Sequence, residues 1–421
     1  MPASTTRRSA KTTVKPDTLH LRRTIDTLLD ANVPFVLWGP PGVGKTRVIE
    51  ALAAERGWHC ETVLGSIREP QDIAGFPAIT PDGSFSLLAP DYVQRIVAAV
   101  ERAGEAPGGA VLFLDEVSNC APPQQAALLR VGTDRTIGDT RLPGSCRIVF
   151  AANPPDQAAD GWELSAPLAN RLVHVDFPAP QAADWAAGLL RNWGGPADPD
   201  PAREARLVAA RAAVAGFVAA RPHLLHELPG DTASAGRAWP SPRSWADLVV
   251  PSLATAAAIT DGDTRAAVEQ VLITGAVGAG AAWEFLTWYG DRDLPDPHHL
   301  LEYPGDFVVP ERPDRVHAVL ASVVGAAIAA GDATSWASAW TILGAAIKAK
   351  LGEIAAVSAR ALLESWPEGA PRPPEFGEFR TMLRRTGLMQ RIEVAEAAAP
   401  DTVLVGAARP AAAEPADGAA R

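Results

Sequence analysis

One run of eight residues has the residue types and the spacing that bind a polyphosphate. It is Gly39-Pro40-Pro41-Gly42-Val43-Gly44-Lys45-Thr46, and it lies between an apolar run at 34–38 and a helix expected at 45–56. The glycines allow backbone N–H groups to converge on phosphate oxygens without obstruction by side chains. The N-terminus of the following helix adds the positive end of its dipole. Lys45 would reach the β- and γ-phosphates, and the Thr46 hydroxyl would bind Mg²⁺. The sequence therefore predicts a site for a nucleoside triphosphate with Mg²⁺.

Two acids directly follow a second apolar run, residues 111–114. Asp115, at the end of this expected strand, could hold Mg²⁺ beside Thr46. Its neighbour Glu116 could polarise an attacking water as a general base. The alternative is that the acidic pair only caps the next helix. Because the glycine-rich loop is expected on the same sheet, we favour the catalytic interpretation.

A third apolar run, residues 148–152, ends in Asn153-Pro154. An amide at this position could orient the attacking water together with Glu116. Asn-Pro is also a favourable turn sequence, so this signal depends on the two motifs before it.

The order of expected elements predicts an α/β fold. Apolar strands are expected at 35–38, 59–64, 111–114, 147–152 and 172–177, and helices at 45–56, 91–101 and 122–131. Strands that are apolar throughout and separated by helices indicate a parallel sheet sandwiched by helices. Two hairpin-like insertions are expected at 76–88 and 135–143. From about residue 179 the pattern becomes wholly helical.

Composition restricts the class of protein. The chain has 421 residues, 47% of them hydrophobic, and a net charge of −11, which argues against an extended nucleic-acid face. Its three cysteines form no C-x-x-C pair, which fits a reducing cytoplasm. The longest uncharged runs, 318–331 and 333–347, are shorter than the roughly 18 residues of a membrane span, so we expect no membrane partner.

The ordered motifs resemble those of an AAA+ ATPase. They are G-P-P-G-V-G-K-T, then L-F-L-D-E, then F-A-A-N-P. Residues 68–75 and the hairpin after them resemble the helix-2 insert of the MoxR and dynein-related branch. The resemblance covers roughly residues 17–290. It implies a P-loop AAA+ parallel sheet, followed by an all-α lid and a helical C-terminal extension.

The resemblance also assigns roles to residues outside the loop at 39–46. It implies that Asn153 is sensor 1, and that Arg243, in Ser241-Pro242-Arg243, is sensor 2 on a lid helix reaching back to the γ-phosphate. Arg171 matches the arginine finger that acts on ATP bound by a neighbouring subunit. Here Asn170 replaces the usual acid and Leu172 an aromatic residue, so a surface ion pair is the alternative for Arg171. Arg130 and Arg135 are the reserve candidates.

What the resemblance implies for function is an ATP hydrolase that remodels or activates a client protein. Members of this branch commonly form a ring, usually a hexamer, and work with a partner bearing a von Willebrand factor A domain. Phe76, Ile79, Phe85 and Leu87 are the apolar residues of the expected hairpin, and they either face the pore or pack on the sheet. The alternatives are a nucleotide-gated scaffold that hydrolyses little ATP and a nucleic-acid motor of restriction type.

We expect five segments along the chain. They are a disordered basic arm at 1–15, an AAA+ α/β core at 16–178, a helical lid at 179–290, a helical extension at 291–398 and a disordered tail at 399–421. Within the last third, His298-His299 is expected in a solvent-exposed loop. Four tryptophans at helical spacings are expected mostly in the core: Trp283, Trp288, Trp336 and Trp340.

Overall fold

The structure of the chain is a computed structural model, which describes residues 18–103, 108–154, 157, 161–290, 294–367, 370 and 379. The expected basic arm at 1–15 and the expected tail at 399–421 lie outside these residues. The described chain forms two compact units. Of the described residues, the first unit contains those up to 185 together with 222–252 and 260–284, and the second contains those at 186–221, 253–259 and from 285 onward.

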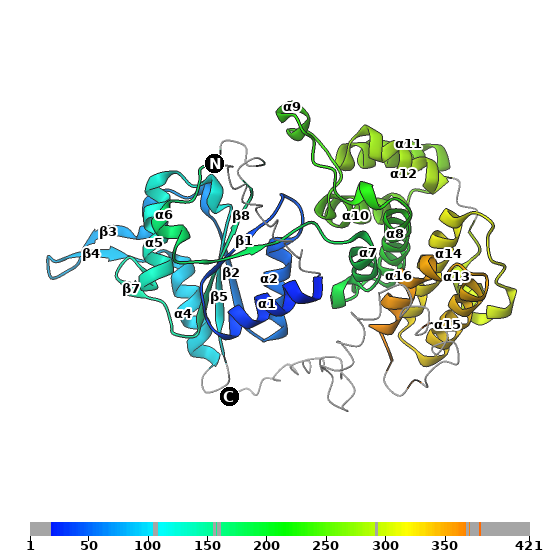
Figure 1. Cartoon of the computed structure of the whole chain (residues 1–421), viewed down its shortest axis with the longest axis horizontal. Coiled ribbons are helices and arrows are strands. Elements are labelled where there is room, and N and C mark those ends of the chain that lie inside the picture. The colour runs from blue at the N-terminus through cyan, green and yellow to red at the C-terminus, as the bar shows by residue number, and fades with distance from the viewer. Residues whose placement is uncertain are drawn as a thin grey trace, which may run out of the picture. The chain divides into compact units, whose positions relative to one another are not determined.

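A five-stranded parallel sheet is the centre of the first unit (Figure 1). Its order is β2-β5-β8-β1-β9, and the strands are β1 (Phe35–Trp38), β2 (His59–Leu64), β5 (Ala110–Asp115), β8 (Cys146–Ala152) and β9 (Val173–Asp176). All five strands expected from the sequence are confirmed within one residue at each end. The strands β5, β8 and β1 are adjacent and parallel, so the loops that follow them meet at one edge of the sheet.

Alternate residues of each strand face two separate apolar cores. Phe35 and Leu37 of β1 pack with α1 (Thr18–Asp30) and α2 (Lys45–Glu55). Val36, between them in sequence, packs on the other face, which α3 (Pro70–Ala74), α4 (Asp91–Ala103), α5 (Pro122–Asp134) and α6 (Ala166–Ala169) cover. Both faces are buried because the central strands β5, β8 and β1 are apolar at nearly every position, as the sequence predicts.

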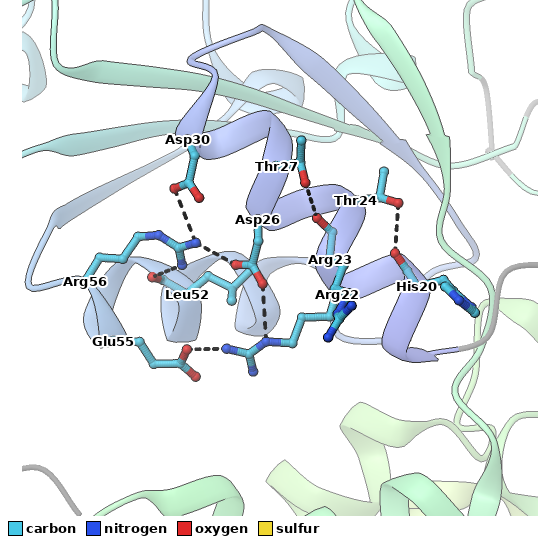
Figure 2. A network of polar contacts seen from close by, with 10 residues as sticks. All are labelled: His20, Arg22, Arg23, Thr24, Asp26, Thr27, Asp30, Leu52, Glu55 and Arg56. Atoms are coloured by element: carbon cyan, nitrogen blue, oxygen red, sulfur yellow. Dashed lines mark hydrogen bonds and ion pairs between the residues drawn. The ribbon is translucent and has the colours of Figure 1, made fainter. Parts of the chain in front are cut away.

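Ion pairs join α1 to the helix that begins with Lys45. Figure 2 shows Arg56, the residue directly after α2, donating to Asp26 at 2.6 Å, with Asp30 at 3.5 Å, while Arg22 of α1 reaches Glu55 of α2. These side chains are partly exposed, so their contribution to stability is small. They join two helices that cover the same face of the sheet.

Two antiparallel hairpins interrupt the parallel sheet, as expected. β3 (Phe76–Ile79) pairs with β4 (Phe85–Leu88), and β6 (Thr136–Ile137) pairs with β7 (Thr140–Arg141). The first hairpin projects from the sheet (Figure 1), and Ile79 and Phe85 are 80% and 71% exposed. Of the two alternatives for the apolar residues of this hairpin, packing on the sheet is therefore wrong for these two side chains.

The remaining elements are helical. They are α7 (Ala182–Leu190), α8 (Pro201–Ala220), α9 (Thr232–Ala235), α10 (Val250–Ala256), α11 (Gly262–Val277), α12 (Ala279–Gly290), α13 (Pro297–Glu302), α14 (Pro313–Ala330), α15 (Ala333–Lys348) and α16 (Gly352–Leu363). The compact units do not follow the expected boundary at residue 290, because 186–221 groups with the last third of the chain. In the second unit α8 packs on α14, and α14 also contacts α13, α15 and α16.

One expectation for the helical part needs correction, and the expectation that the four tryptophans lie mostly in the core is confirmed for three of them. His298 and His299 are exposed, as expected, but they lie in helix α13 rather than in a loop, because Asp296 caps that helix through the His298 N–H at 3.0 Å. Trp288, Trp336 and Trp340 are buried, whereas Trp283 is 71% exposed. Among the described residues, α14 alone is long and apolar enough to cross a membrane, with a mean hydropathy of 1.2, and 56% of it is buried, as in a core helix.

Candidate nucleotide site

The glycine-rich loop, residues 39–46, connects β1 to α2, so the sequence prediction of a strand, loop and helix is confirmed. Gly42 and Gly44 have φ values of 75° and 98°, which are accessible to glycine at little cost. At Gly42 an added Cβ would lie 2.9 Å from the Ser241 hydroxyl oxygen. The loop therefore needs glycine there for its backbone conformation and for the close approach of residue 241.

Lys45 is buried, with 7% of its surface exposed, and its ammonium group points back into the loop. It donates to the Gly39 carbonyl at 2.7 Å, the Pro40 carbonyl at 3.0 Å and the Asn153 side-chain oxygen at 2.9 Å. Burial lowers the pKa of Lys45 to about 8, although the Asp115 carboxylate opposes this shift. Asn153, directly after β8, and the loop after β1 thus both contact the Lys45 ammonium group, a cation suited to bind phosphate oxygens.

Thr46 and Asp115 meet at the same edge of the sheet. The Thr46 hydroxyl donates to one carboxylate oxygen of Asp115 at 2.8 Å. A hydroxyl and a carboxylate are oxygen ligands of the kind that Mg²⁺ prefers, and one or two protein ligands suffice when phosphates and waters complete the octahedron. These two residues therefore fit the predicted magnesium site.

Glu116 follows Asp115 in a left-handed conformation, with φ 58° and ψ 35°. This conformation is unusual for a residue other than glycine, and it is one of the strained geometries that occur at functional sites. The Glu116 N–H donates to the Asp115 carboxylate at 2.8 Å, and its own carboxylate accepts from the Ser66 hydroxyl at 2.5 Å. The turn thus separates two adjacent acids: Asp115 faces Thr46, and Glu116 faces Ser66.

Asn153 is held from both sides. Its side-chain oxygen accepts from Lys45, and its backbone N–H donates to the buried Ser118 hydroxyl at 3.1 Å. The structure therefore brings together four residues that the sequence analysis singled out separately: Lys45, Thr46, Asp115 and Asn153.

A helical segment far along the chain contacts the outer side of the loop. The Arg243 N–H donates to the Gly42 carbonyl at 3.1 Å, at the start of a π-helical turn, Ser244–Val249. The His226 imidazole contacts the Pro41 carbonyl at 3.2 Å and packs edge-on against Trp239. Burial lowers the pKa of His226, and the positive charge of Lys45 lowers it further. The Arg243 side chain is exposed, and its charge also acts on Lys45.

The three arginines considered for the trans role lie elsewhere. Arg171 is exposed and donates to the Pro167 carbonyl at 2.7 Å. Arg135 donates to Asn32 at 3.1 Å and to the Cys146 carbonyl, so its guanidinium has a structural role. Arg130 is exposed on α5. The contacts of Arg171 and Arg135 described here thus involve residues outside the loop at 39–46.

Three residues at the site were not predicted from the sequence: Ser66, Ser118 and His226. A serine or a single histidine carries no spacing signal, and each reaches the site only through the tertiary fold. The one available indication was position, since Ser66 closely follows β2 and Ser118 closely follows Glu116.

Residues 34–172 match the family of AAA domains of the dynein-related subfamily. With the strand order and the site above, this segment is an AAA+ domain of that subfamily, as the sequence motifs suggested. The residues after 172 lie outside the match.

Solved structures add a weaker likeness. One is a protein from Cytophaga hutchinsonii described as a candidate ATPase, with 21% identity and a TM-score of 0.26, covering 37% of this chain and 46% of that one. Another is NtrX from Brucella abortus in complex with ATP, with 18% identity and a TM-score of 0.34, covering 80% of this chain and 67% of that one. The ADP complex of NtrX has 18% identity and a TM-score of 0.35, and the match covers 84% of this chain and 69% of that one. The chain spans about half the length of the first two matching structures. These TM-scores are low, so the assignment depends on the family match and the site geometry. A search of curated proteins finds no match.

Proposed function

We propose that the protein binds and hydrolyses Mg-ATP. The observation that carries this proposal is the convergence of four side chains from three loops at one edge of the sheet. Lys45 lies 2.9 Å from Asn153, and Thr46 lies 2.8 Å from Asp115. The ammonium group would bind the β- and γ-phosphates, while the hydroxyl and the carboxylate would hold Mg²⁺. The metal, when bound, neutralises charge on the phosphate oxygens.

Glu116 is the candidate general base in this proposal. One of its carboxylate oxygens accepts from Ser66, which leaves the other free to accept a proton from water. Asn153 would orient that water once Lys45 donates to phosphate instead of to the amide oxygen. Arg243 starts a helix whose backbone contacts Gly42, so its side chain can reach the phosphates from the lid.

Topology supports an action of Arg171 in trans. Arg171 precedes β9, whereas the loop at 39–46 follows β1, and the two strands are parallel neighbours. Arg171 thus lies at the amino edge of the sheet and the phosphate loop at the carboxyl edge. A four-residue strand is about 13 Å long, so Arg171 is separated from its own phosphate loop by roughly the length of the strand. We propose that it completes the site of a neighbouring subunit in a ring, with six subunits as the family's usual number.

The exposed hairpin β3–β4 supports a role in remodelling a client protein. Phe85 and Ile79 are too exposed to contribute to the core, and exposed apolar side chains commonly mark a binding surface. We propose a chaperone-like ATPase of MoxR type in a reducing cytoplasm, with a von Willebrand factor A protein as its possible partner. The Glu116→Gln protein, which should hold its client longer, is the bait for a pull-down read by mass spectrometry.

The central test separates binding from hydrolysis. Glu116→Gln should lower turnover by roughly 10²–10⁴ while ATP still binds, because only the base is lost. Lys45→Ala should abolish binding in calorimetry. The matched control is Glu55→Gln, an exposed acid at the other end of α2, which should leave both unchanged. An enzyme whose ATPase activity is absent, or unaffected by Glu116→Gln, would be a nucleotide-gated scaffold instead.

Two further measurements test the ring and the alternative partner. Sedimentation of Glu116→Gln with ATP should show an oligomer, and a monomer would contradict the ring. Nucleic-acid binding that weakens steeply with salt would favour the motor of restriction type.

A further inference from the structure

His174, on the edge strand β9, makes two polar contacts that point in opposite directions. The Trp38 indole N–H donates to its Nδ1 at 2.9 Å, and its Nε2 lies 2.9 Å from the Ala169 carbonyl oxygen. An indole N–H can only donate and a carbonyl can only accept. Both bonds are therefore satisfied by one tautomer of the imidazole, in which Nε2 carries the proton.

The two partners of His174 belong to functionally different parts of the fold. Trp38 is the last residue of β1 and directly precedes Gly39, whose carbonyl accepts from Lys45. Ala169 is the last residue of α6, two positions before Arg171. One imidazole thus links the strand that enters the phosphate loop to the segment that carries the candidate arginine finger.

The strand register explains how these side chains meet. In the parallel pair, Val36 lies opposite His174 and Trp38 lies opposite Asp176, so Trp38 and His174 are diagonal neighbours on one face. Their rings are nearly parallel, with an interplanar angle of 16° and centroids 6.0 Å apart. The indole is partly buried against the core on that face, which fixes its N–H direction.

The second bond acts on the end of α6. The last carbonyls of a helix have no partner within the helix, and α6 has only four residues. His174 gives the Ala169 carbonyl a second and shorter contact beside the Leu172 N–H, which donates at 3.4 Å. The Arg171 backbone N–H donates to the Leu168 carbonyl at 3.1 Å, and the Arg171 guanidinium donates to the Pro167 carbonyl. The position of Arg171 therefore depends on the C-terminal end of α6, which the His174 imidazole contacts.

We propose that His174 is a positioning residue that holds the α6 terminus, and through it Arg171, in register with the strand leading to the phosphate loop. This inference rests on the proposed trans role of Arg171. His174 touches neither substrate nor metal, and it affects the rate at the neighbouring subunit's site only through Arg171.

The test is a double-mutant cycle on the full-length protein. His174→Phe keeps a ring against Trp38 and removes both hydrogen bonds, whereas His174→Gln keeps one acceptor and one donor. We expect His174→Phe to lower kcat about 3- to 10-fold, the worth of one hydrogen bond, with KM changed less than about 2-fold. His174→Gln should recover most of this loss, and Trp38→Phe, which lacks the N–H donor, should reproduce part of it.

The decisive readout is the combination with Arg171→Ala. If His174 acts through Arg171, the double variant should be no slower than Arg171→Ala alone. An equal further loss in the double variant would mean a purely structural role and would overturn the proposal, as would a wild-type rate for His174→Phe. His59→Phe on β2 is the matched control, since it removes a histidine that contacts Glu61 on the opposite edge strand.

The measured rates also distinguish a wrong assignment of Arg171 as the arginine finger from a wrong positioning role of His174. If Arg171→Ala alone keeps the wild-type rate, the finger assignment is wrong and the positioning role is overturned with it. A slow Arg171→Ala beside an unaffected His174→Phe overturns only the positioning role.

Discussion

A half-buried histidine, His317, makes the helical unit sensitive to acid. His317 lies on α14, which packs closely on α8. A Cβ added at Gly216 of α8 would lie only 3.3 Å from the His317 carbonyl oxygen. Burial lowers the pKa of His317 to about 4. The carboxylate that favours its protonation, Asp314, accepts from Arg312 at 2.7 Å and so offers little compensation.

The direction of the pH dependence follows from the different proton affinities of His317 in the unfolded and the folded protein. The unfolded chain takes up a proton at His317 near pH 6.5, whereas the folded unit does so only near pH 4, so stability falls as the pH falls between these values. With these two pKa values, the loss between pH 7.5 and pH 5 is about 2 kcal/mol, and it reaches about 3.4 kcal/mol below pH 4. Above pH 6.5 His317 is neutral in both states and contributes no pH dependence.

The assay compares wild type with His317→Gln at pH 7.5 and pH 5. Urea unfolding, read by hydrogen exchange of α14 peptides, follows the helical unit separately from the sheet unit. The variant should lose about 2 kcal/mol less than wild type on acidification, whatever its stability at pH 7.5. His299→Gln, at an exposed position on α13, is the matched control and should behave like wild type. Equal acid losses in wild type and His317→Gln would refute the reasoning.

Three further changes test the sheet unit. Ser66→Ala removes the hydrogen bond to Glu116, which should change kcat by about 10-fold or more with ATP affinity preserved, as steady-state kinetics and calorimetry can measure. Gly42→Ala places a Cβ against Ser241 at a φ of 75°, and it should weaken ATP binding by about 10-fold or more in calorimetry. Asp139→Ala removes the acceptor for Leu87 and Ser86, so hydrogen exchange in the β3–β4 hairpin should accelerate, while Asp82→Ala at the hairpin tip should leave the β4 end protected.

The sequence predicted the elements of the sheet because local pattern determines them. The strands β1, β5 and β8 are apolar at nearly every position, and the acids or amide that follow them must lie at one edge of a parallel sheet. The contact of Thr46 with Asp115 was foreseeable for that reason. The contact of Lys45 with Asn153 was not specifically predicted, although both residues were placed at the same edge.

The rest of the site depends on contacts between distant segments. His226 lies 185 positions after Pro41, and nothing in the spacing of the sequence connects them. The interleaving of the compact units was missed for the same reason. Helical periodicity shows that α8 has an apolar face, but it does not identify α14, about a hundred residues later, as the partner of that face.

The two hairpins are joined by hydrogen bonds and form one structural unit. A two-stranded hairpin is marginally stable alone, and β3–β4 exposes large apolar side chains that do not contribute to a core. Its base is held by Asp139 in the turn of the second hairpin, whose carboxylate accepts from the Leu87 N–H at 2.7 Å and whose N–H donates to the Leu87 carbonyl at 2.9 Å. Gly138 allows this approach, because a Cβ there would lie 2.3 Å from the Leu87 carbonyl oxygen.

The second hairpin connects α5 directly to β8, the strand that ends at Asn153. A movement of the second hairpin would therefore be transmitted to the first, because Asp139 hydrogen-bonds to both the N–H and the carbonyl of Leu87. The exposed Phe85 and Ile79 would then move as a rigid tip relative to the sheet.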